Sequence, residues 1–416
     1  MRRPSKSHSR KLSSDSQRLT SLAQGLVQSS SRVEERAWEH NLDTLLHKLL
    51  KTNHQDTLDA ALDHLFKSDL IAYDTLMEAV EACSESGALE HEGVAYQALL
   101  IAIPILAWTR FSIASGSVPA DAVTTLSAHL HAHVLAPDTR VAMAPTLFAI
   151  DQLPRSHAET FAVTQRMTQA ALSNGPLKPL ANPPETAPFL ADTRYLLATV
   201  VARAGEPLFQ WQSTMNPADR LTALAAWSEQ ATPNIVRLLP GCSVELLLPE
   251  AYYVACREAD KYIRPASIRA AVHFLTHTLG LESNGLRAVI GSFSEDPLSG
   301  RVDEYRIGFT VRQSPDVVYG LVWPLYGQED EEEANEASLE VLLTPEESAA
   351  GGQQTPIEEI LTLLRECGII HIKRHTERFP LEFCEDCGAP LYPDPDAELV
   401  HAEMPEDAPA GTGHFH

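Results

Sequence analysis

Hydrophobic residues in the first part of the chain recur at intervals of three, four and seven, the period of helices with one buried face. The clearest stretch is 33–50, where eight apolar residues form one stripe, and 58–66 and 70–80 repeat the pattern. Further helices are expected at 119–135, 138–153 and 155–172. The pattern therefore predicts an all-helical domain over residues 15–173.

Five prolines crowd the stretch 174–188. Proline lacks a backbone N–H and interrupts helices, so this stretch is expected to be a linker. Beyond it, short apolar runs bounded by turn residues predict strands as well as helices. Residues 189–380 are therefore interpreted as a second domain of the α+β class, carrying a solvated acidic insert at 328–355 with no binding role.

From residue 243 onward the expected order is strand, helix, strand, strand, strand, helix, strand. The first helix in this order is expected to consist of two helices, 250–262 and 265–279. Strands 303–311 and 317–325 are expected to form a hairpin. With one added strand, this order resembles the split-βαβ, ferredoxin-like unit. That fold hosts many functions, so it names none.

Charge narrows the range of partners. The 416 residues include 32 basic and 56 acidic side chains, for a net charge of −24. Such a protein repels phosphate backbones, which disfavours nucleic acids and anionic membranes. The exception is a basic, serine-rich arm at 1–14, which is expected to be disordered but could touch RNA or a ribosome through Arg2, Arg3, Lys6, Arg10 and Lys11.

Six scattered cysteines are too few for a secreted disulfide scaffold, and no apolar signal segment follows the basic start. The longest apolar run, 98–108, contains a proline and is too short to span a bilayer. A cytoplasmic location with reduced thiols is expected. The chain also lacks the glycine-rich phosphate loops and the G-x-S-x-G elbow, so no complete catalytic signature is present.

The sharpest chemical signal is Cys384-Glu-Asp-Cys387-Gly388 in the tail, 381–416. Two thiols on a tight turn resemble half of a zinc ribbon, but no second pair follows, so histidines would complete a tetrahedral Zn²⁺ site. The candidates are His401, His414 and His416, which follow Cys387 by 14, 27 and 29 residues. A structural zinc site, a zinc-free turn, a redox dithiol and an open catalytic zinc site remain as alternatives. The acidic neighbours are expected to raise the thiol pKa and disfavour redox chemistry.

An enzyme remains the alternative interpretation. Tyr253, Arg257 and Asp260 belong to a dense polar stretch that could line a cleft between the two domains. Cys256 could act as a nucleophile with His273 or His277 as base, provided that the fold brings them within hydrogen-bond reach. Internal ion pairs on an ordinary helix explain the same residues equally simply.

Several stretches together resemble an uncharacterised protein family of β-proteobacteria, namely 1–5, 107–110, 150–155, 248–260, 317–326 and 383–391. The likeness covers nearly the whole chain and implies a bacterial cytosolic protein without assigned functional residues. The resemblance does not choose between an enzyme and an adaptor. From the domain organisation and the cysteine pair, the chain is interpreted as a non-enzymatic binding or regulatory protein with an unknown protein partner and a structural zinc knuckle.

Overall fold

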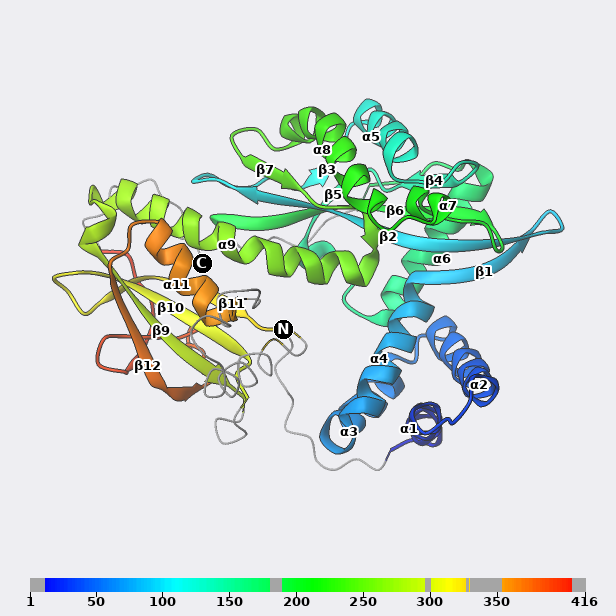
Figure 1. Ribbon diagram of the computed structural model, residues 1–416, viewed down its shortest axis with the longest axis horizontal. Helices are drawn as coiled ribbons and strands as arrows, with labels where there is room; N and C mark the ends of the chain where they lie inside the picture. The colour runs from blue at the N-terminus through cyan, green and yellow to red at the C-terminus, as the bar shows by residue number, and fades with distance from the viewer. Residues whose placement is uncertain (1–11, 180–188, 296–300, 327–328, 330–353, 406–416) are drawn as a thin grey trace, which may run out of the picture.

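The computed structural model describes residues 12–179, 189–295, 301–326, 329 and 354–405 (Figure 1). The basic arm falls almost entirely outside these residues, as do most of the acidic insert and the second half of the proline-rich stretch. Within the described part, no helix combines the length and the apolar character needed to cross a membrane.

The chain opens with a bundle of four helices, as the periodicity predicts: α1 (Ser14–Val27), α2 (Arg32–Lys51), α3 (Gln55–Ser68) and α4 (Leu70–Glu85). Side chains of Ser13, Ser31 and Asp69 accept backbone amide hydrogens at the starts of α1, α2 and α4. The leucines of the predicted stripes form the bundle's core. Capping and periodicity thus agree on where these helices begin and what they bury.

The expectation that helices continue to residue 173 is wrong. Helices α5 (Ala120–His133) and α6 (His157–Ser173) lie where predicted, but five strands separate them from the bundle and from each other. These strands are β1 (Ser86–His91), β2 (Val94–Trp108), β3 (Gly116–Ser117), β4 (Arg140–Met143) and β5 (Thr146–Ala149). In β2 the run 100–107 is buried on both faces, so it carries no period that distinguishes strand from helix.

The strands build an eight-stranded sheet with β6 (Ala191–Arg203), β7 (Ser243–Leu246) and β8 (Glu250–Ala251). The main path runs β1-β2-β6-β5-β3, with β4 beside β6 and with β7 and β8 beside β2. One face is covered by α5 and α8 (Asp219–Leu238), and the short α7 (Gln210–Thr214) lies between β6 and α8 along the chain. Helix α6 packs below the sheet, as Figure 1 shows.

A single helix, α9 (Tyr252–Leu279), replaces the two helices expected on either side of Pro265. Its first half packs on the large sheet through Ala255 and Ala259, and its second half enters the core of a smaller sheet through Ile268 and Leu275. Proline leaves the carbonyl four residues earlier without its helical partner. Here the Nε of Arg264 donates to that carbonyl, on Lys261, at 3.2 Å, so the helix continues.

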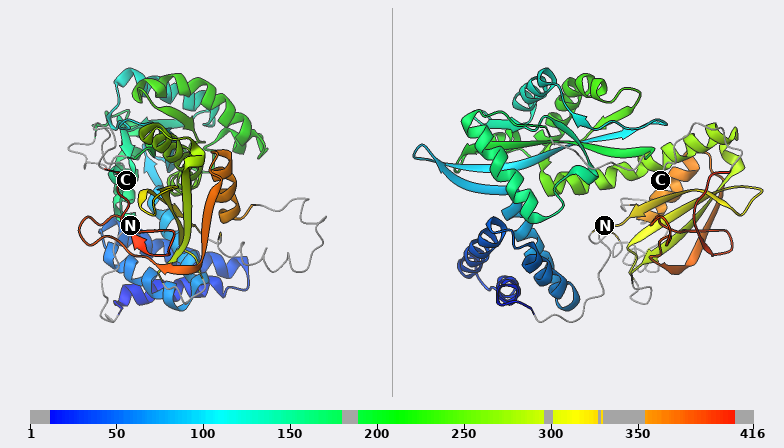
Figure 2. Two further views of the ribbon diagram at one scale, coloured as in Figure 1. Left: turned by 90° about the vertical axis from the view of Figure 1, so that its left-hand side faces the viewer. Right: turned by 180° about the vertical axis from the view of Figure 1, so that it is seen from behind.

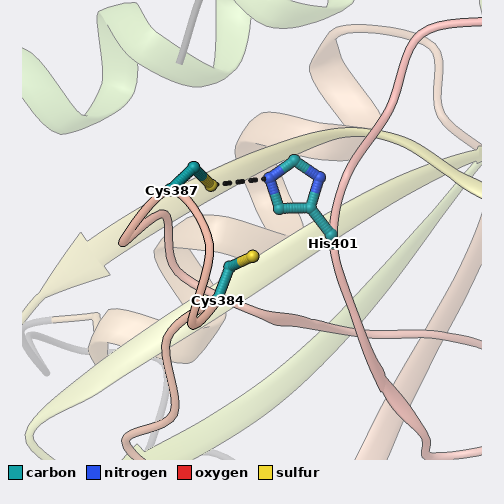
Figure 3. Close-up of side chains that lie close together, drawn as sticks. All are labelled: Cys384, Cys387 and His401. Atoms are coloured by element: carbon teal, nitrogen blue, oxygen red, sulfur yellow. Dashed lines mark hydrogen bonds between the residues drawn. The ribbon is translucent and has the colours of Figure 1, made fainter.

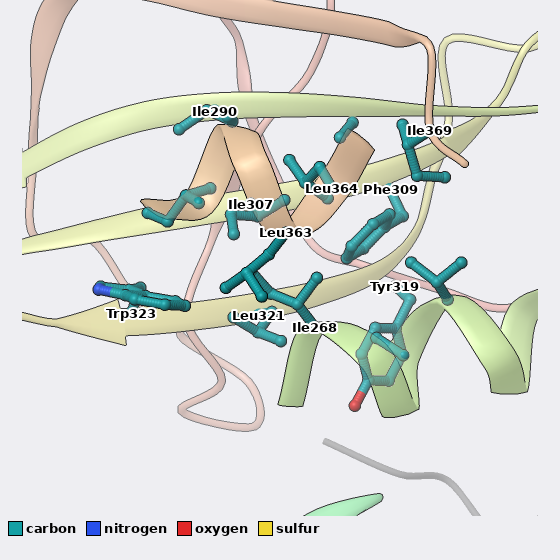
Figure 4. Close-up of a cluster of buried hydrophobic side chains, with 14 of the residues drawn as sticks. Ile268, Ile290, Ile307, Phe309, Tyr319, Leu321, Trp323, Leu363, Leu364 and Ile369 are labelled. Carbon is teal, nitrogen blue, oxygen red and sulfur yellow. The ribbon is translucent and has the colours of Figure 1, made fainter. Parts of the chain in front are cut away.

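The smaller sheet has the order β11-β10-β9-β12. Its strands are β9 (Leu286–Ser294), β10 (Glu304–Val311), β11 (Val317–Pro324) and β12 (His371–Pro380), and β12 runs parallel to β9. Helix α11 (Pro356–Glu366) makes the crossover between β11 and β12. Helices α9 and α11 cover one face, where Leu363, Leu364, Ile268 and Trp323 meet in one core (Figure 4).

The ferredoxin-like arrangement is not what the structure shows. The strand expected to open that unit, β7, pairs with β2 in the large sheet. The small sheet is therefore an antiparallel meander of three strands, extended by one parallel strand after a helical crossover. The overall α+β class is confirmed, and the predicted β10–β11 hairpin is present with Gly308 opposite Gly320. Figures 1 and 2 show the helical bundle and the small sheet at separate places below the large sheet.

Candidate metal centre

The tail forms a tight turn that carries both cysteines of the C-x-x-C motif. The Cys384 amide donates to the Ala389 carbonyl at 2.7 Å, and the Gly388 amide donates to the Cys384 carbonyl at 2.9 Å. Gly388 has φ +76°, in the left-handed region that glycine adopts without a side-chain clash. Phe383 and Pro390 form an antiparallel bridge below the turn. The local sequence thus fixes a closed loop with both thiols near its tip.

A short hairpin after the turn returns the chain to the cysteines. It pairs β13 (Tyr392–Pro393) with β14 (Leu399–Val400). The side chain of Asp394 shapes its bend, because one carboxylate oxygen accepts the amides of Asp396 and Glu398 at 2.8 and 2.9 Å. His401 follows β14 directly, and the hairpin thereby places its ring beside the turn.

Cys384, Cys387 and His401 converge as Figure 3 shows. Their two sulfurs and one ring nitrogen all lie within 4.8 Å of one another, and Cys387 Sγ is 3.2 Å from His401 Nε2. Cys387 is exposed, while Cys384 and His401 are half-buried. The group could hold a metal ion, and the structure brings together three of the five ligands predicted from the sequence.

The two other predicted ligands, His414 and His416, lie outside the described residues. His375, which lies just upstream of the cysteine turn, has another partner, because its Nε2 lies 2.9 Å from the carbonyl oxygen of Asp394. On the far side of the His401 ring, Nδ1 lies 3.4 Å from a carboxylate oxygen of Glu403. Within the described residues this Nδ1 makes no hydrogen bond, so the contact with Glu403 is one of proximity only.

The electrostatics of the turn correct one sequence-based expectation. The backbone amides of Cys387 and Asp386 lower the pKa of the Cys384 thiol, and this effect outweighs the opposing charge of Asp386. The acidic neighbours therefore do not dominate, because amide groups aimed at a sulfur stabilise its thiolate at shorter range. A thiolate is the form of cysteine that binds metals.

A cavity of about 420 Å³ lies beside the cluster. Its walls come from the β10–β11 turn and from the returning tail, and they include Asp316, Val400, His401 and Glu403. His401 therefore belongs both to the candidate metal centre and to a wall of this cavity. A metal ion bound to His401 would therefore also restrict the position of this part of the cavity wall.

The residues considered for an enzyme site serve internal contacts. The Tyr253 hydroxyl lies 3.1 Å from Thr160 Oγ1, and Arg257 pairs with Glu81 at 2.7 Å, which ties α9 to α6 and α4. Asp260 accepts a hydrogen bond from Tyr326, and burial raises the pKa of its carboxyl to about 6. These side chains hold α9 in place.

Cys256 does not meet the requirements of a nucleophile. Burial raises the pKa of its thiol far above the ordinary value, so the thiol is protonated at neutral pH. His273 lies 17 residues further along the same helix, a rise of about 25 Å, and His277 lies further still. His277 instead contacts Arg110, at 2.9 Å. The proposed cysteine–histidine pair is therefore not formed.

The fold and the cluster together describe an α+β protein with a candidate metal centre in its tail. Residues 4–415 match the family described as "Protein of unknown function (DUF2863)", and the chain belongs to that family. No curated protein and no solved structure is similar enough to match. The family resemblance inferred from the sequence is thus confirmed, while the β-proteobacterial source stays a prediction.

Proposed function

We propose that this protein is a non-enzymatic binding or regulatory protein in which a structural Zn²⁺ ion joins the cysteine turn of the C-terminal tail to His401, further along the same tail. The observation that carries the proposal is the convergence of Cys384, Cys387 and His401 within 4.8 Å. Ligands about 2.3 Å from zinc at tetrahedral angles lie about 3.8 Å apart, so the cluster needs only small side-chain shifts to fit. Two thiolates and one imidazole are also the donors that zinc prefers.

The donor set supports a structural rather than a catalytic ion. Cysteine and histidine ligands that close a four-coordinate shell are typical of structural zinc, whereas a catalytic ion keeps one position open for water. We expect the fourth ligand from His414 or His416, which would close the coordination sphere.

The proposed binding role is based on the cavity that lies beside the zinc site. A bound ion would join the cysteine turn to His401 and so hold one wall of the neighbouring cavity. A short segment that buries little apolar surface gains folding free energy from such an ion. The net charge of −24 favours a protein partner over nucleic acid, and we place the protein in the cytoplasm, where thiolate ligands stay reduced.

Zinc content tests the proposal. The purified full chain should carry about one zinc ion, measured by elemental analysis, and Cys384→Ser should remove it. Cys242→Ser is the matched control, because Cys242 is also a half-buried free thiol but lies outside the cluster. Less than about half an equivalent in the wild type, or equal zinc in Cys384→Ser and wild type, would contradict the proposal.

A further inference from the structure

A buried arginine lies directly beneath the cysteine turn. Arg306, on β10, is fully buried, and its Nη1 donates hydrogen bonds to the carbonyl oxygens of Glu382 and Leu391, each at 2.7 Å. These two residues are the ends of the turn, and they also bond to each other, from the Leu391 amide to the Glu382 carbonyl at 3.2 Å. One guanidinium nitrogen therefore holds both ends of the loop that carries the cysteines.

The arginine is itself fixed in orientation. Its Nε donates to a carboxylate oxygen of Glu304 at 2.6 Å, which compensates the buried charge. Its guanidinium carbon lies over two aromatic rings, 4.3 Å from the centroid of Phe293 and 5.0 Å from that of Phe383. Cation–π contacts of this kind are strongest where water is excluded. The side chain thus has little freedom to move away from the turn.

The segment after the turn, β13, packs against glycines of the small sheet. A Cβ on Gly320 would come within 2.1 Å of the Tyr392 ring, and one on Gly308 would come within 2.8 Å of the Pro393 carbonyl. Along β10 and β11 these glycines alternate with core residues such as Ile307 and Leu321, so they lie on the face opposite α9 and α11. Strand β13 can approach only because these side chains are missing.

None of these contacts uses a cysteine sulfur or the His401 ring. We propose that Arg306 is the positioning residue of the metal centre and that it keeps the Cys384–Cys387 turn in its ligating shape before any metal binds. The inference rests on the proposed zinc site and adds how its affinity is set. Because the turn is ordered in advance, metal binding does not have to supply the free energy of ordering it.

Zinc affinity of the full chain, measured by competition with a chromophoric chelator, tests the inference. Arg306→Lys keeps a positive charge near Glu304 but cannot repeat the arginine's set of hydrogen bonds. We expect zinc to bind about 10- to 100-fold more weakly to this variant, the range seen when an outer contact that supports a metal site is lost. The thiolate–Co²⁺ absorption bands should keep their positions, because the ligands are unchanged. Arg287→Lys, on neighbouring β9, is the control and should bind zinc as the wild type does.

Hydrogen exchange separates positioning of the turn from a general loss of fold. In the metal-free wild type, the bonded amides of Cys384, Gly388 and Leu391 should stay protected. In metal-free Arg306→Lys they should exchange at least tenfold faster, while the amides of β9 to β11 remain protected. Phe383→Ala is the second variant, to be used if Arg306→Lys does not fold. It removes the half-exposed ring over the guanidinium, leaves Glu304 paired, and should also speed exchange of the turn amides.

Two outcomes would overturn the role of Arg306. One is zinc affinity within twofold of the wild type in folded Arg306→Lys, and the other is unprotected turn amides in the metal-free wild type. Failure of the proposed function gives a different result, because the wild-type chain would then bind no zinc. In that case the exchange rates of the turn amides would still show whether Arg306 orders the turn.

Discussion

The carboxylate of Glu85 accepts a hydrogen bond from the backbone amide of Tyr253 at 2.9 Å. Glu85 is the last residue of α4 and Tyr253 lies in the first turn of α9, so the end of the bundle caps the helix that joins both sheets. The first turn of a helix leaves amides without partners, and an acidic side chain satisfies one of them. The arrangement couples the bundle to the rest of the fold.

Glu85 should make stability depend on pH. Burial raises the pKa of its carboxyl from 4.5 to about 7. A carboxyl whose pKa is raised by folding contributes stability that is fully present below pH 4.5 and is lost as the pH rises through 7. Glu85→Gln cannot ionise and can still accept the amide hydrogen. We expect it to be more stable than the wild type at pH 8, by about 2 to 3 kcal/mol, and nearly equal at pH 4.5.

Urea unfolding followed by circular dichroism at the two pH values measures this difference. Glu78→Gln is the control, because Glu78 lies exposed on the same helix. Its effect should be small and the same at both pH values. A Glu85→Gln protein that is less stable than the wild type at pH 8 would show that the ionised carboxylate is needed as a cap.

The sequence predicted the parts of the fold in which local pattern and tertiary environment agree. The leucine stripe of α2 faces one core and its charges face solvent, so the helical period is visible. Strand β2 is different, because Ile101, Ile103 and Ile105 lie in one core and Leu100, Ala102 and Leu106 in another. A segment buried on both faces has no polar positions to mark its period, and here only tertiary pairing with β6 decides the structure.

The candidate site shows the same division. The cysteine pair and His401 lie close together in the chain, and residue types with ligand spacing were enough to select them. Arg306 was not found, since it lies 76 residues from Glu382 and its contact with the turn depends on where β10 runs. A buried arginine has no sequence signature of its own. The role of the glycines on β10 and β11 was not predicted either, because it depends on the packing of β13 against them.

The histidines of the tail should differ in their effect on zinc binding. His401→Gln should lower zinc affinity by at least 100-fold, because it removes one of the three converging donors. His375→Gln is the control: this imidazole contacts the Asp394 carbonyl and lies outside the cluster. The double variant His414→Gln/His416→Gln, which removes both terminal histidines, should lose as much zinc affinity as His401→Gln does. Isothermal titration with zinc measures all three, and wild-type affinity in the double variant would exclude both terminal histidines as ligands.

Gly320 should be intolerant of even one added methyl group. A Cβ at this position would overlap the Tyr392 ring, so Gly320→Ala must displace the tail or distort β11. We expect a loss of about 1 to 3 kcal/mol in the free energy of unfolding and faster proteolysis of the tail. Gly285→Ala is the control, since its Cβ would meet the nearest neighbour at an ordinary 3.7 Å. Equal proteolysis rates for the two variants would mean that β13 is not seated on Gly320.

The last prediction concerns the proline inside α9. Arg264 bonds the Lys261 carbonyl that Pro265 leaves free, and it also bonds the Pro324 carbonyl at 2.7 Å and pairs with Glu329 at 2.9 Å. Arg264→Met should therefore cost about 2 to 4 kcal/mol, because it leaves these acceptors without a donor.

Pro265→Ala restores an amide that can bond the Lys261 carbonyl directly. In that background Arg264→Met should cost less, by about 1 kcal/mol, because one of its acceptors already has a partner. Chemical unfolding of the wild type, both single variants and the double variant measures this coupling. Strict additivity would show that the arginine stabilises α9 only through Pro324 and Glu329, and that the proline is tolerated for another reason.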